Sequence, residues 1–269
     1  MDSSELSNEL DDFRIEKDEE SAVANVTLDS GKANPLSTKT LNELFEAAVA
    51  VNEDEDVRCV VLTGSGGFYC SGFDLGKLEG GPEDGTTLRG AVSTFHDAVV
   101  QLHQADKPVV TGVNGVAAGG GFGLAVLGDV MVMSEDARLE YAYSRVGLTG
   151  DGGSTFFLPR LVGLRRATEI ALLDRPVEAQ EAVEMGLATE AVADEEFDDR
   201  LEEVAHELAD GPTKAYAATK RLMTRSFDRG LEEQLGAETE AMAEATHTED
   251  YARGVEAFFS EEEPEFEGR

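Results

Sequence analysis

The sequence contains no tryptophan, two cysteines and four histidines, and these scarcities limit the chemistry that it can perform. The cysteines, Cys59 and Cys70, are too few for a disulfide framework or a cysteine-based metal cluster. His96 and His103 lie two turns apart on a predicted helix, but no further ligands lie near them in sequence, so no metal site is expected. We interpret Cys70 as a small buried residue rather than a nucleophile.

Long apolar runs are also missing. The longest uncharged stretch, residues 109–128, is interrupted by Asn114 and is rich in glycine, which argues against a membrane span. The N-terminal residues lack the succession of basic, apolar and small residues that a signal peptide has. These features predict a cytoplasmic protein with no membrane partner.

Basic residues are scarce, because 56 Asp and Glu oppose 22 Lys and Arg, which gives a formal net charge of -34. Without a basic stripe to neutralise phosphates, a nucleic-acid partner is not expected. The acidic residues are spread along the chain rather than gathered in one tail. Since salt near 1 M shortens the screening length to about 3 Å, we interpret this composition as halophilic, an adaptation to a salt-rich cytoplasm.

Glycine-rich turns that follow apolar runs are the main feature that the sequence does contain. In residues 107–128, valines predict a strand, and three glycines at 119–121 precede a predicted buried helix start at 122–127. A helix that begins in a glycine turn presents its unpaired N–H groups and its positive dipole end to that turn. The stretch therefore predicts an anion or oxyanion site, or else a tight turn whose glycines serve only packing.

Two further glycine-rich turns occupy residues 64–75 and 147–155, and the second of these includes one carboxylate, Asp151. The other segments are predicted from periodicity and turn residues: strands over 23–28, 57–63 and 129–134, a helix over 38–54 capped by Ser37, a mobile loop over 77–90, a helix over 91–104, a helix pair over 156–173, and several helices between 178 and 259. Together they predict an α/β core with an α-helical appendage.

Three motifs in this order, FYCSGFDL, NGVAAGGGFGLA and GLTGDGGSTFFLPRLVG, resemble the enoyl-CoA hydratase/isomerase family, which has the crotonase fold. The resemblance extends over about residues 20–268. It implies an α/β spiral of β-β-α units, with a catalytic core over 1–200 and a C-terminal helical trimerisation region over 201–269. It also implies an acyl-CoA thioester as substrate, with coenzyme A as part of the substrate and no separate cofactor, and assembly as a homotrimer or a dimer of trimers.

The resemblance further implies an oxyanion hole for the thioester oxygen. Its two donors would be the backbone N–H groups of Phe73 and Gly120, and the second agrees with a helix that begins in the glycine turn. The coenzyme A moiety would contact residues in and around the first motif: Ala33, Ser71, Gly72, Asp74, Leu75 and Lys77. Judged from the residues alone, Asp74 has a structural role in its turn. Lys77 could contact a phosphate of coenzyme A or could equally be a solvated lysine.

Hydratases of the family use two glutamates, at positions that correspond here to Gly123 and Tyr143. Without these carboxylates the addition of water lacks proton carriers. Asp151 lies four residues after Gly147, as in family isomerases that move a double bond or rearrange a ring epoxide in phenylacetate breakdown. The resemblance therefore implies that Asp151 shuttles a proton between two carbons. Tyr143 would donate a hydrogen bond to Asp151 or to substrate, or would be an ordinary buried tyrosine.

We expect an apolar pocket with Phe73, Phe122 and Phe156 to raise the pKa of Asp151. From the residues alone, Asp151 could instead only cap its turn. Two alternatives remain open: a hydratase or thioester hydrolase that uses water held by Asp151, and a coenzyme A-binding or assembly protein without turnover. A branch whose aspartate attacks chlorinated aryl thioesters is disfavoured, because it has tryptophan at the position of Tyr143.

Overall fold

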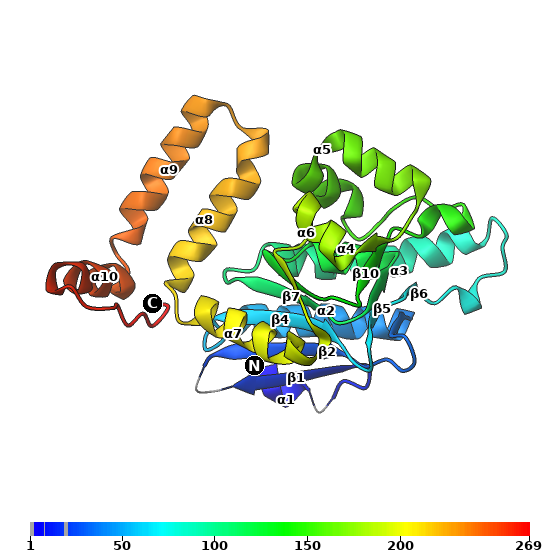
Figure 1. Ribbon diagram of the computed structural model, residues 1–269, viewed down its shortest axis with the longest axis horizontal. Coiled ribbons are helices and arrows are strands. Elements are labelled where there is room, and N and C mark those ends of the chain that lie inside the picture. Colours follow the sequence, from blue (N-terminus) through cyan, green and yellow to red (C-terminus); the bar gives the residue numbers. More distant parts are fainter. Residues whose placement is uncertain (1–2, 8, 19–20) are drawn as a thin grey trace.

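The chain forms two main sheets and passes repeatedly from one to the other between residues 59 and 140, as the computed structural model shows (Figure 1). The structure describes residues 3–7, 9–18 and 21–269. The larger sheet has the order β1-β2-β4-β7-β9-β12, formed by β1 (Phe13–Asp18), β2 (Val23–Leu28), β4 (Cys59–Gly64), β7 (Val109–Val113), β9 (Val130–Ser134) and β12 (Glu190–Val192). The smaller sheet has the order β11-β10-β8-β5, formed by β11 (Val177–Glu178), β10 (Arg138–Glu140), β8 (Val116–Ala118) and β5 (Phe68–Cys70).

A short parallel pair, β3 (Pro35–Leu36) with β6 (Gly72–Phe73), lies beside these sheets. The helices of the core are α1 (Ser3–Leu6), α2 (Thr38–Glu53), α3 (Asp84–His103), α4 (Gly120–Val126), α5 (Ser154–Leu173), α6 (Ala179–Met185) and α7 (Phe197–Ala209). The C-terminal helices are α8 (Thr213–Arg225), α9 (Leu231–Ala245) and α10 (Glu249–Ser260).

The same unit repeats along the core. A strand of the larger sheet is followed by a strand of the smaller sheet and then by a helix, as in β4-β5-α3, β7-β8-α4 and β9-β10-α5. The strands of the larger sheet run parallel except for β1, and β4 and β7 pair with Val60 opposite Val109. This arrangement is the predicted crotonase-type spiral of β-β-α units, and that prediction is confirmed.

The central strands read as continuous apolar runs because helices cover both faces of the larger sheet. One face packs against α2, whose Leu41 and Leu44 are buried in the main core. The other face packs against α7 through Phe197 and Leu201, which belong to a second, smaller core. Ser37 caps α2 as predicted, and its side chain accepts the Thr40 N–H at 3.1 Å.

Helices α8, α9 and α10 project from the core as an arm, and the chain end returns toward the core beside α10 (Figure 1). The buried Asp250 of α10 accepts the N–H groups of Glu267 at 2.7 Å and Gly268 at 2.9 Å. Arg58, immediately before β4, donates to the carbonyl of Phe266 at 3.0 Å. The predicted division at residue 200 falls inside α7, which packs on the sheet, whereas the arm begins at α8.

One local prediction is wrong, and one strand was not predicted. The loop predicted over 77–90 is helical in its second half, because α3 begins at Asp84, whose carboxylate accepts the N–H groups of Glu79 and Gly80. The strand β1 was not predicted; its alternation places Phe13 and Ile15 in the core. The helix pair over 156–173 is present as α5, which breaks at Gly163 (φ 75°, ψ 155°).

Within the described ranges, every helix is too short or too polar to span a bilayer.

Candidate active site

The first and second glycine turns meet where β6 approaches the start of α4. A Cβ added to Gly72 would lie 2.7 Å from the carbonyl oxygen of Ala118 and 3.3 Å from the backbone nitrogen of Gly120. Gly72 (φ 87°) and Gly119 (φ 55°) both adopt backbone conformations that side chains disfavour. Glycine is therefore needed on both sides of this junction, which brings the backbones of Phe73 and Gly120 close together.

The two predicted oxyanion donors face this junction for different reasons. Gly120 is the first residue of α4, and the first N–H groups of a helix have no partner within the helix. Immediately after β6, the N–H of Asp74 donates to the Leu36 carbonyl at 3.0 Å. Because successive N–H groups of an extended strand point to opposite sides, we expect the N–H of Phe73 to point away from β3. Two such donors can stabilise negative charge on one oxygen.

Asp151 lies in the third glycine turn, immediately before α5, and its carboxylate is paired with a phenol. The hydroxyl of Tyr143 donates to Oδ1 of Asp151 at 2.5 Å. Burial raises the pKa of Asp151, while the hydrogen bond from Tyr143 opposes that rise. Burial and the Asp151 charge also raise the pKa of Tyr143, so the phenol stays protonated and remains a donor. The carboxylate is thus desolvated but held in one orientation.

Gly123 lies in α4 directly against the turn that contains Asp151. A Cβ at Gly123 would lie 2.7 Å from the carbonyl oxygen of Gly152, a contact that real side chains do not make with a backbone. The position that corresponds to one hydratase glutamate therefore has no room for a side chain. Tyr143, at the position of the other glutamate, is 7% exposed and directed at Asp151.

Helix α3 supports the same turn from another side. The N–H of Gly152 donates to Nε2 of His96 at 3.2 Å, so this nitrogen carries no proton. The ring of Phe95 lies 2.6 Å from the point that a Cβ on Gly152 would occupy. Sequence analysis placed His96 on this helix but did not connect it with Asp151, since the two residues are far apart in sequence and no spacing rule relates them.

The residues predicted to contact coenzyme A lie together near β3 and β6. The carbonyl of Ala33 accepts the N–H of Ser71 at 3.0 Å, and Gly72 pairs with Pro35. Ser71, Leu75 and Lys77 are exposed, Ala33 and Asp74 are partly buried, and Gly72 is buried.

Asp74 has the turn role expected from its context, because its side chain accepts the N–H of Gly76 at 3.0 Å. Cys70 is fully buried, and this burial raises the pKa of its thiol to about 12, as expected for a packing residue. Three phenylalanines were predicted to surround Asp151. Phe122 is buried and Phe73 packs against the core, but Phe156 is 38% exposed and lies under the guanidinium of Arg160.

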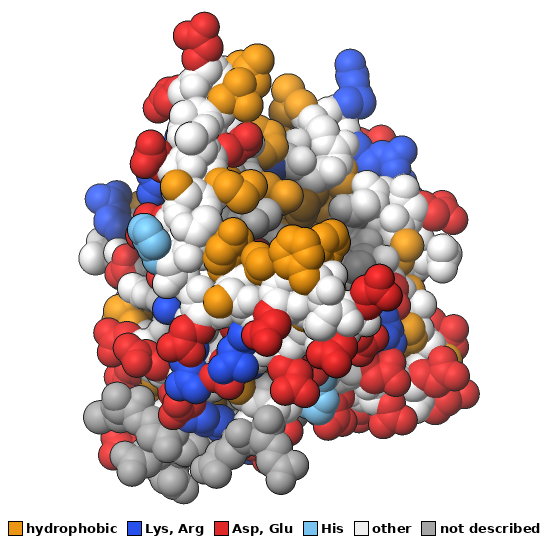
Figure 2. Space-filling model, turned by 90° about the vertical axis from the view of Figure 1, so that its left-hand side faces the viewer, with side chains coloured by type: hydrophobic (Ala, Val, Ile, Leu, Met, Phe, Trp, Pro, Cys, Tyr) orange, Lys and Arg blue, Asp and Glu red, His pale blue; other side chains and the backbone are white. Residues whose placement is uncertain are grey.

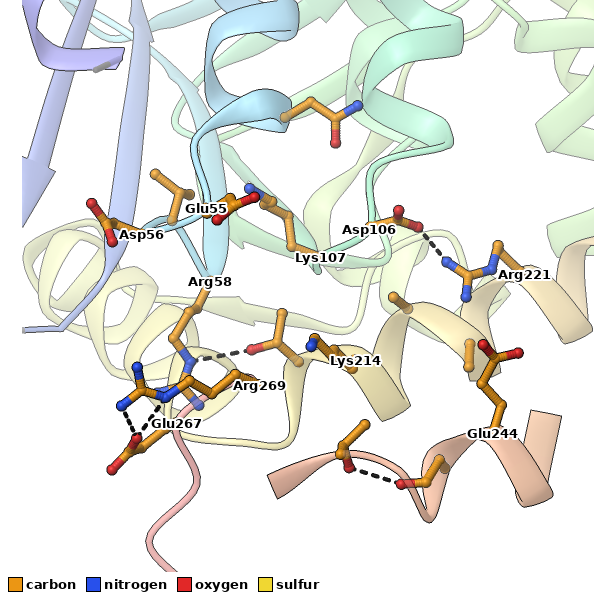
Figure 3. Close-up of a pocket in the computed structure, with 18 of the residues that line it drawn as sticks. Glu55, Asp56, Arg58, Asp106, Lys107, Lys214, Arg221, Glu244, Glu267 and Arg269 are labelled. Atoms are coloured by element: carbon orange, nitrogen blue, oxygen red, sulfur yellow. Dashed lines mark hydrogen bonds and ion pairs between the residues drawn. The ribbon is translucent and has the colours of Figure 1, made fainter. Parts of the chain in front are cut away.

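A separate cavity of about 1440 Å³ lies between the core and the arm and contains none of the predicted site residues (Figure 3). Its charged lining is largely occupied by protein contacts: Arg58 donates to the Gly211 carbonyl at 2.7 Å, and Lys107 to the carbonyls of Val51 and Asp54 at 2.8 Å. Arg58, which also donates to the Thr213 hydroxyl of α8 at 3.2 Å, belongs to the attachment of the arm, whereas Lys107 holds the end of α2. In the described part of the chain, His, Cys, Asp and Glu side chains do not gather in groups of three or more that could hold a metal ion.

Comparison with known proteins identifies the family. The family model described as enoyl-CoA hydratase/isomerase matches residues 18–269, which is nearly the whole chain. The chain belongs to the enoyl-CoA hydratase/isomerase family. It is therefore an acyl-CoA enzyme of the hydratase/isomerase class.

Individual members of the enoyl-CoA hydratase/isomerase family differ in their named activities. The chain is 36% identical to a Rhodobacter capsulatus protein named "probable enoyl-CoA hydratase", over 92% of the chain and 95% of that protein. It is 34% identical to the 1,2-epoxyphenylacetyl-CoA isomerase of Escherichia coli, over 93% of the chain and 97% of the relative. A crystal structure of an enoyl-CoA hydratase/isomerase-type protein from Mycobacterium abscessus superposes with a TM-score of 0.90 at 32% identity, covering 96% of this chain and 100% of that one.

Proposed function

We propose that this enzyme shifts a double bond within an acyl-CoA thioester and uses Asp151 as its single proton carrier. The observation that supports the proposal is the buried pair formed by Asp151 and Tyr143, with a hydrogen bond of 2.5 Å, beside a helix position that has no room for a second carboxylate. Isomerisation needs only one carrier, because the proton that leaves one carbon is returned to another.

The reaction begins when the carboxylate of Asp151 removes a proton from C2 of a 3-enoyl thioester. The electron pair moves into the C1–C2 bond, and negative charge builds on the thioester oxygen. The N–H groups of Phe73 and Gly120 stabilise this oxyanion, and each such donor is worth about 3 to 4 kcal/mol of the barrier. Protonated Asp151 then returns the proton to C4, and the double bond forms between C2 and C3.

The raised pKa of Asp151 suits both steps. A carboxyl group whose pKa lies nearer neutrality is a better base toward carbon and holds the proton longer during the enolate's lifetime. Tyr143 limits the rise through its hydrogen bond. The same hydrogen bond fixes which carboxylate oxygen faces the substrate.

Hydration is the alternative, favoured by the Rhodobacter capsulatus relative named "probable enoyl-CoA hydratase". Asp151 would then hold a water molecule and act in turn as base and acid. Reaction in deuterium oxide separates the two reactions. We expect a 3-enoyl-CoA to give the conjugated 2-enoyl product, with any deuterium incorporated at C4. No conversion of the 3-enoyl-CoA, together with hydration of a 2-enoyl-CoA to a 3-hydroxyacyl product with deuterium at C2, would contradict the isomerase proposal.

We also propose that the enzyme assembles through its C-terminal arm as a homotrimer or a dimer of trimers. Large apolar side chains are exposed on the arm: Met223, Phe227, Leu231, Leu235, Met242, Phe258 and Phe259. Figure 2 views the end of the molecule that includes these helices and shows hydrophobic side chains gathered there. An apolar surface of this extent on a chain with a net charge of -34 is explained by burial against other copies.

A further inference from the structure

The turn that presents Tyr143 is held in an unfavourable backbone conformation. Ala142, the residue before Tyr143, has φ 61° and ψ -11°, which is the left-handed region that residues with a Cβ disfavour. Leu148 closes the turn by donating its N–H to the Tyr143 carbonyl at 3.0 Å. An alanine stays in this region only where neighbouring contacts hold it there. The position of the Tyr143 hydroxyl therefore depends on the contacts that hold this turn in place.

The carboxylate of Asp174 accepts hydrogen bonds from the residues on both sides of Tyr143. Oδ1 of Asp174 accepts the N–H of Ala142 at 2.7 Å, and Oδ2 accepts the hydroxyl of Ser144 at 2.7 Å. Arg145 adds its Nε–H to Oδ2 at 3.2 Å. The Asp174 side chain is 7% exposed, although Ser144 and Arg145 themselves are exposed. Asp174 therefore acts on Tyr143 through the residues that flank Tyr143 in the chain.

Asp174 is also linked to Asp151 through helix α5. The helix starts just after Asp151, whose carbonyl accepts the N–H of Ser154 at 2.9 Å, and it ends at Asp174, its C-cap. A straight helix of this length would separate its ends by about 30 Å. The break at Gly163 lets the chain fold back, so both ends of α5 reach the segment around Tyr143. The phenol and the carboxylate of the reacting pair are thus fixed by opposite ends of one element.

We propose that Asp174 is a positioning residue for the reaction: it holds the Tyr143 phenol in hydrogen-bonding range of Asp151. This inference rests on the proposed role of Asp151. Without Asp174, the turn relaxes, and Tyr143 leaves the carboxylate. Since the Tyr143 hydrogen bond lowers the pKa of Asp151, its loss raises that pKa further. The effect of Asp174 therefore reaches the chemistry through the protonation state of Asp151.

A double-mutant cycle with Asp174→Ala and Tyr143→Phe tests this directly. We expect each single variant to lower kcat about tenfold and to move the acid limb of the kcat profile to higher pH, with little change in KM. We expect the double variant to be no worse than Tyr143→Phe alone, because both changes remove the same hydrogen bond. Ser144→Ala, which removes one donor to Asp174, should show the same shift in milder form and serves if Asp174→Ala does not fold.

A matched control is Glu43→Gln, since Glu43 is also a buried carboxylate that accepts two backbone N–H groups, those of Asp11 and Asp12, but lies in a different part of the fold. It should change the melting temperature without moving the pH profile. Additive effects in the cycle, or a lowered melting temperature with an unmoved acid limb, would overturn the inference.

Carbon-13 NMR titration of the Asp151 carboxyl, assigned by comparison with Asp151→Asn, gives a readout that needs no turnover. The pKa should be raised in Asp174→Ala and unchanged in Glu43→Gln. If the wild type does not isomerise any 3-enoyl-CoA, the proposed function fails, whereas the positional role of Asp174 fails if Asp174→Ala leaves the pKa of Asp151 unmoved in this titration.

Discussion

The carbonyl oxygen of Gly152 lies 2.7 Å from the point that a Cβ on Gly123 would occupy. The turn that includes Asp151 therefore fills the space that a side chain at position 123 would need. This packing connects two features that are separate in sequence: a missing carboxylate on α4 and a single carboxylate before α5. It favours chemistry with one proton carrier over chemistry with two.

Gly123→Ala should displace the Asp151 turn. We expect a loss of roughly 1 to 3 kcal/mol of folding stability from overpacking and a fall in kcat of at least about tenfold, because the base moves away from the substrate. Thermal unfolding and steady-state kinetics measure both. Gly90→Ala is the matched control, since a Cβ there meets nothing within 4 Å in helix α3. Gly123→Ala with full activity would show that the turn does not depend on this contact.

His96→Leu should weaken the support of the same turn. The buried N–H of Gly152 would lose its acceptor, which costs about 1 to 3 kcal/mol, and we expect kcat to fall by roughly tenfold or more. His96→Gln offers an oxygen acceptor and should retain more activity, and Asp97→Asn, on the neighbouring exposed residue, should behave as wild type. Equal activity of the Leu and Gln variants would mean that the hydrogen bond does not position Asp151.

The contacts of His96 and Asp174 lie beyond what the sequence predicted. Most of the strands and helices and the Ser37 cap followed from local patterns, because turns, caps and apolar runs are encoded within a few residues. The meeting of the glycine turns at Gly72 and Gly120 was implied by the family resemblance. The hydrogen bond from Tyr143 to Asp151 was one of three options that the sequence left open. The contacts of His96 and Asp174 were not predicted, because they join residues far apart in sequence whose meeting depends on packing of whole elements.

Asp151→Asn should be more stable than wild type at neutral pH. Because burial raises the pKa of Asp151 above its value in the unfolded chain, the folded state binds more protons between the two pKa values, and stability falls as pH rises through that window. Above the folded-state pKa the ionised carboxylate is a cost that asparagine avoids. Melting temperatures of both proteins, measured from about pH 4 to about pH 8, test this. The range begins near the ordinary pKa of a carboxyl group and extends upward from it. A variant that is less stable at every pH would contradict it.

Salt should stabilise the fold and the proposed assembly together. Raising KCl from about 0.1 M to 1 M shortens the screening length from about 10 Å to about 3 Å, which weakens repulsion among the excess acidic residues. We expect the melting temperature to rise by at least about 5 °C and light scattering to report a trimer or hexamer. Substituting Phe258 and Phe259, both highly exposed in the single chain, by Ser should yield monomers. A monomer at high salt, or a melting temperature that falls with KCl, would contradict these proposals.

The most direct test of the central claim is the rate at which wild type and Asp151→Asn convert a 3-enoyl-CoA into its conjugated 2-enoyl isomer in molar KCl, followed by absorbance. Asparagine preserves the shape of the side chain but cannot accept a proton from carbon. We predict rapid conversion by wild type and a loss of about 100- to 10,000-fold in the variant, as expected when a general base is removed. Undiminished conversion by Asp151→Asn would show that another group moves the proton.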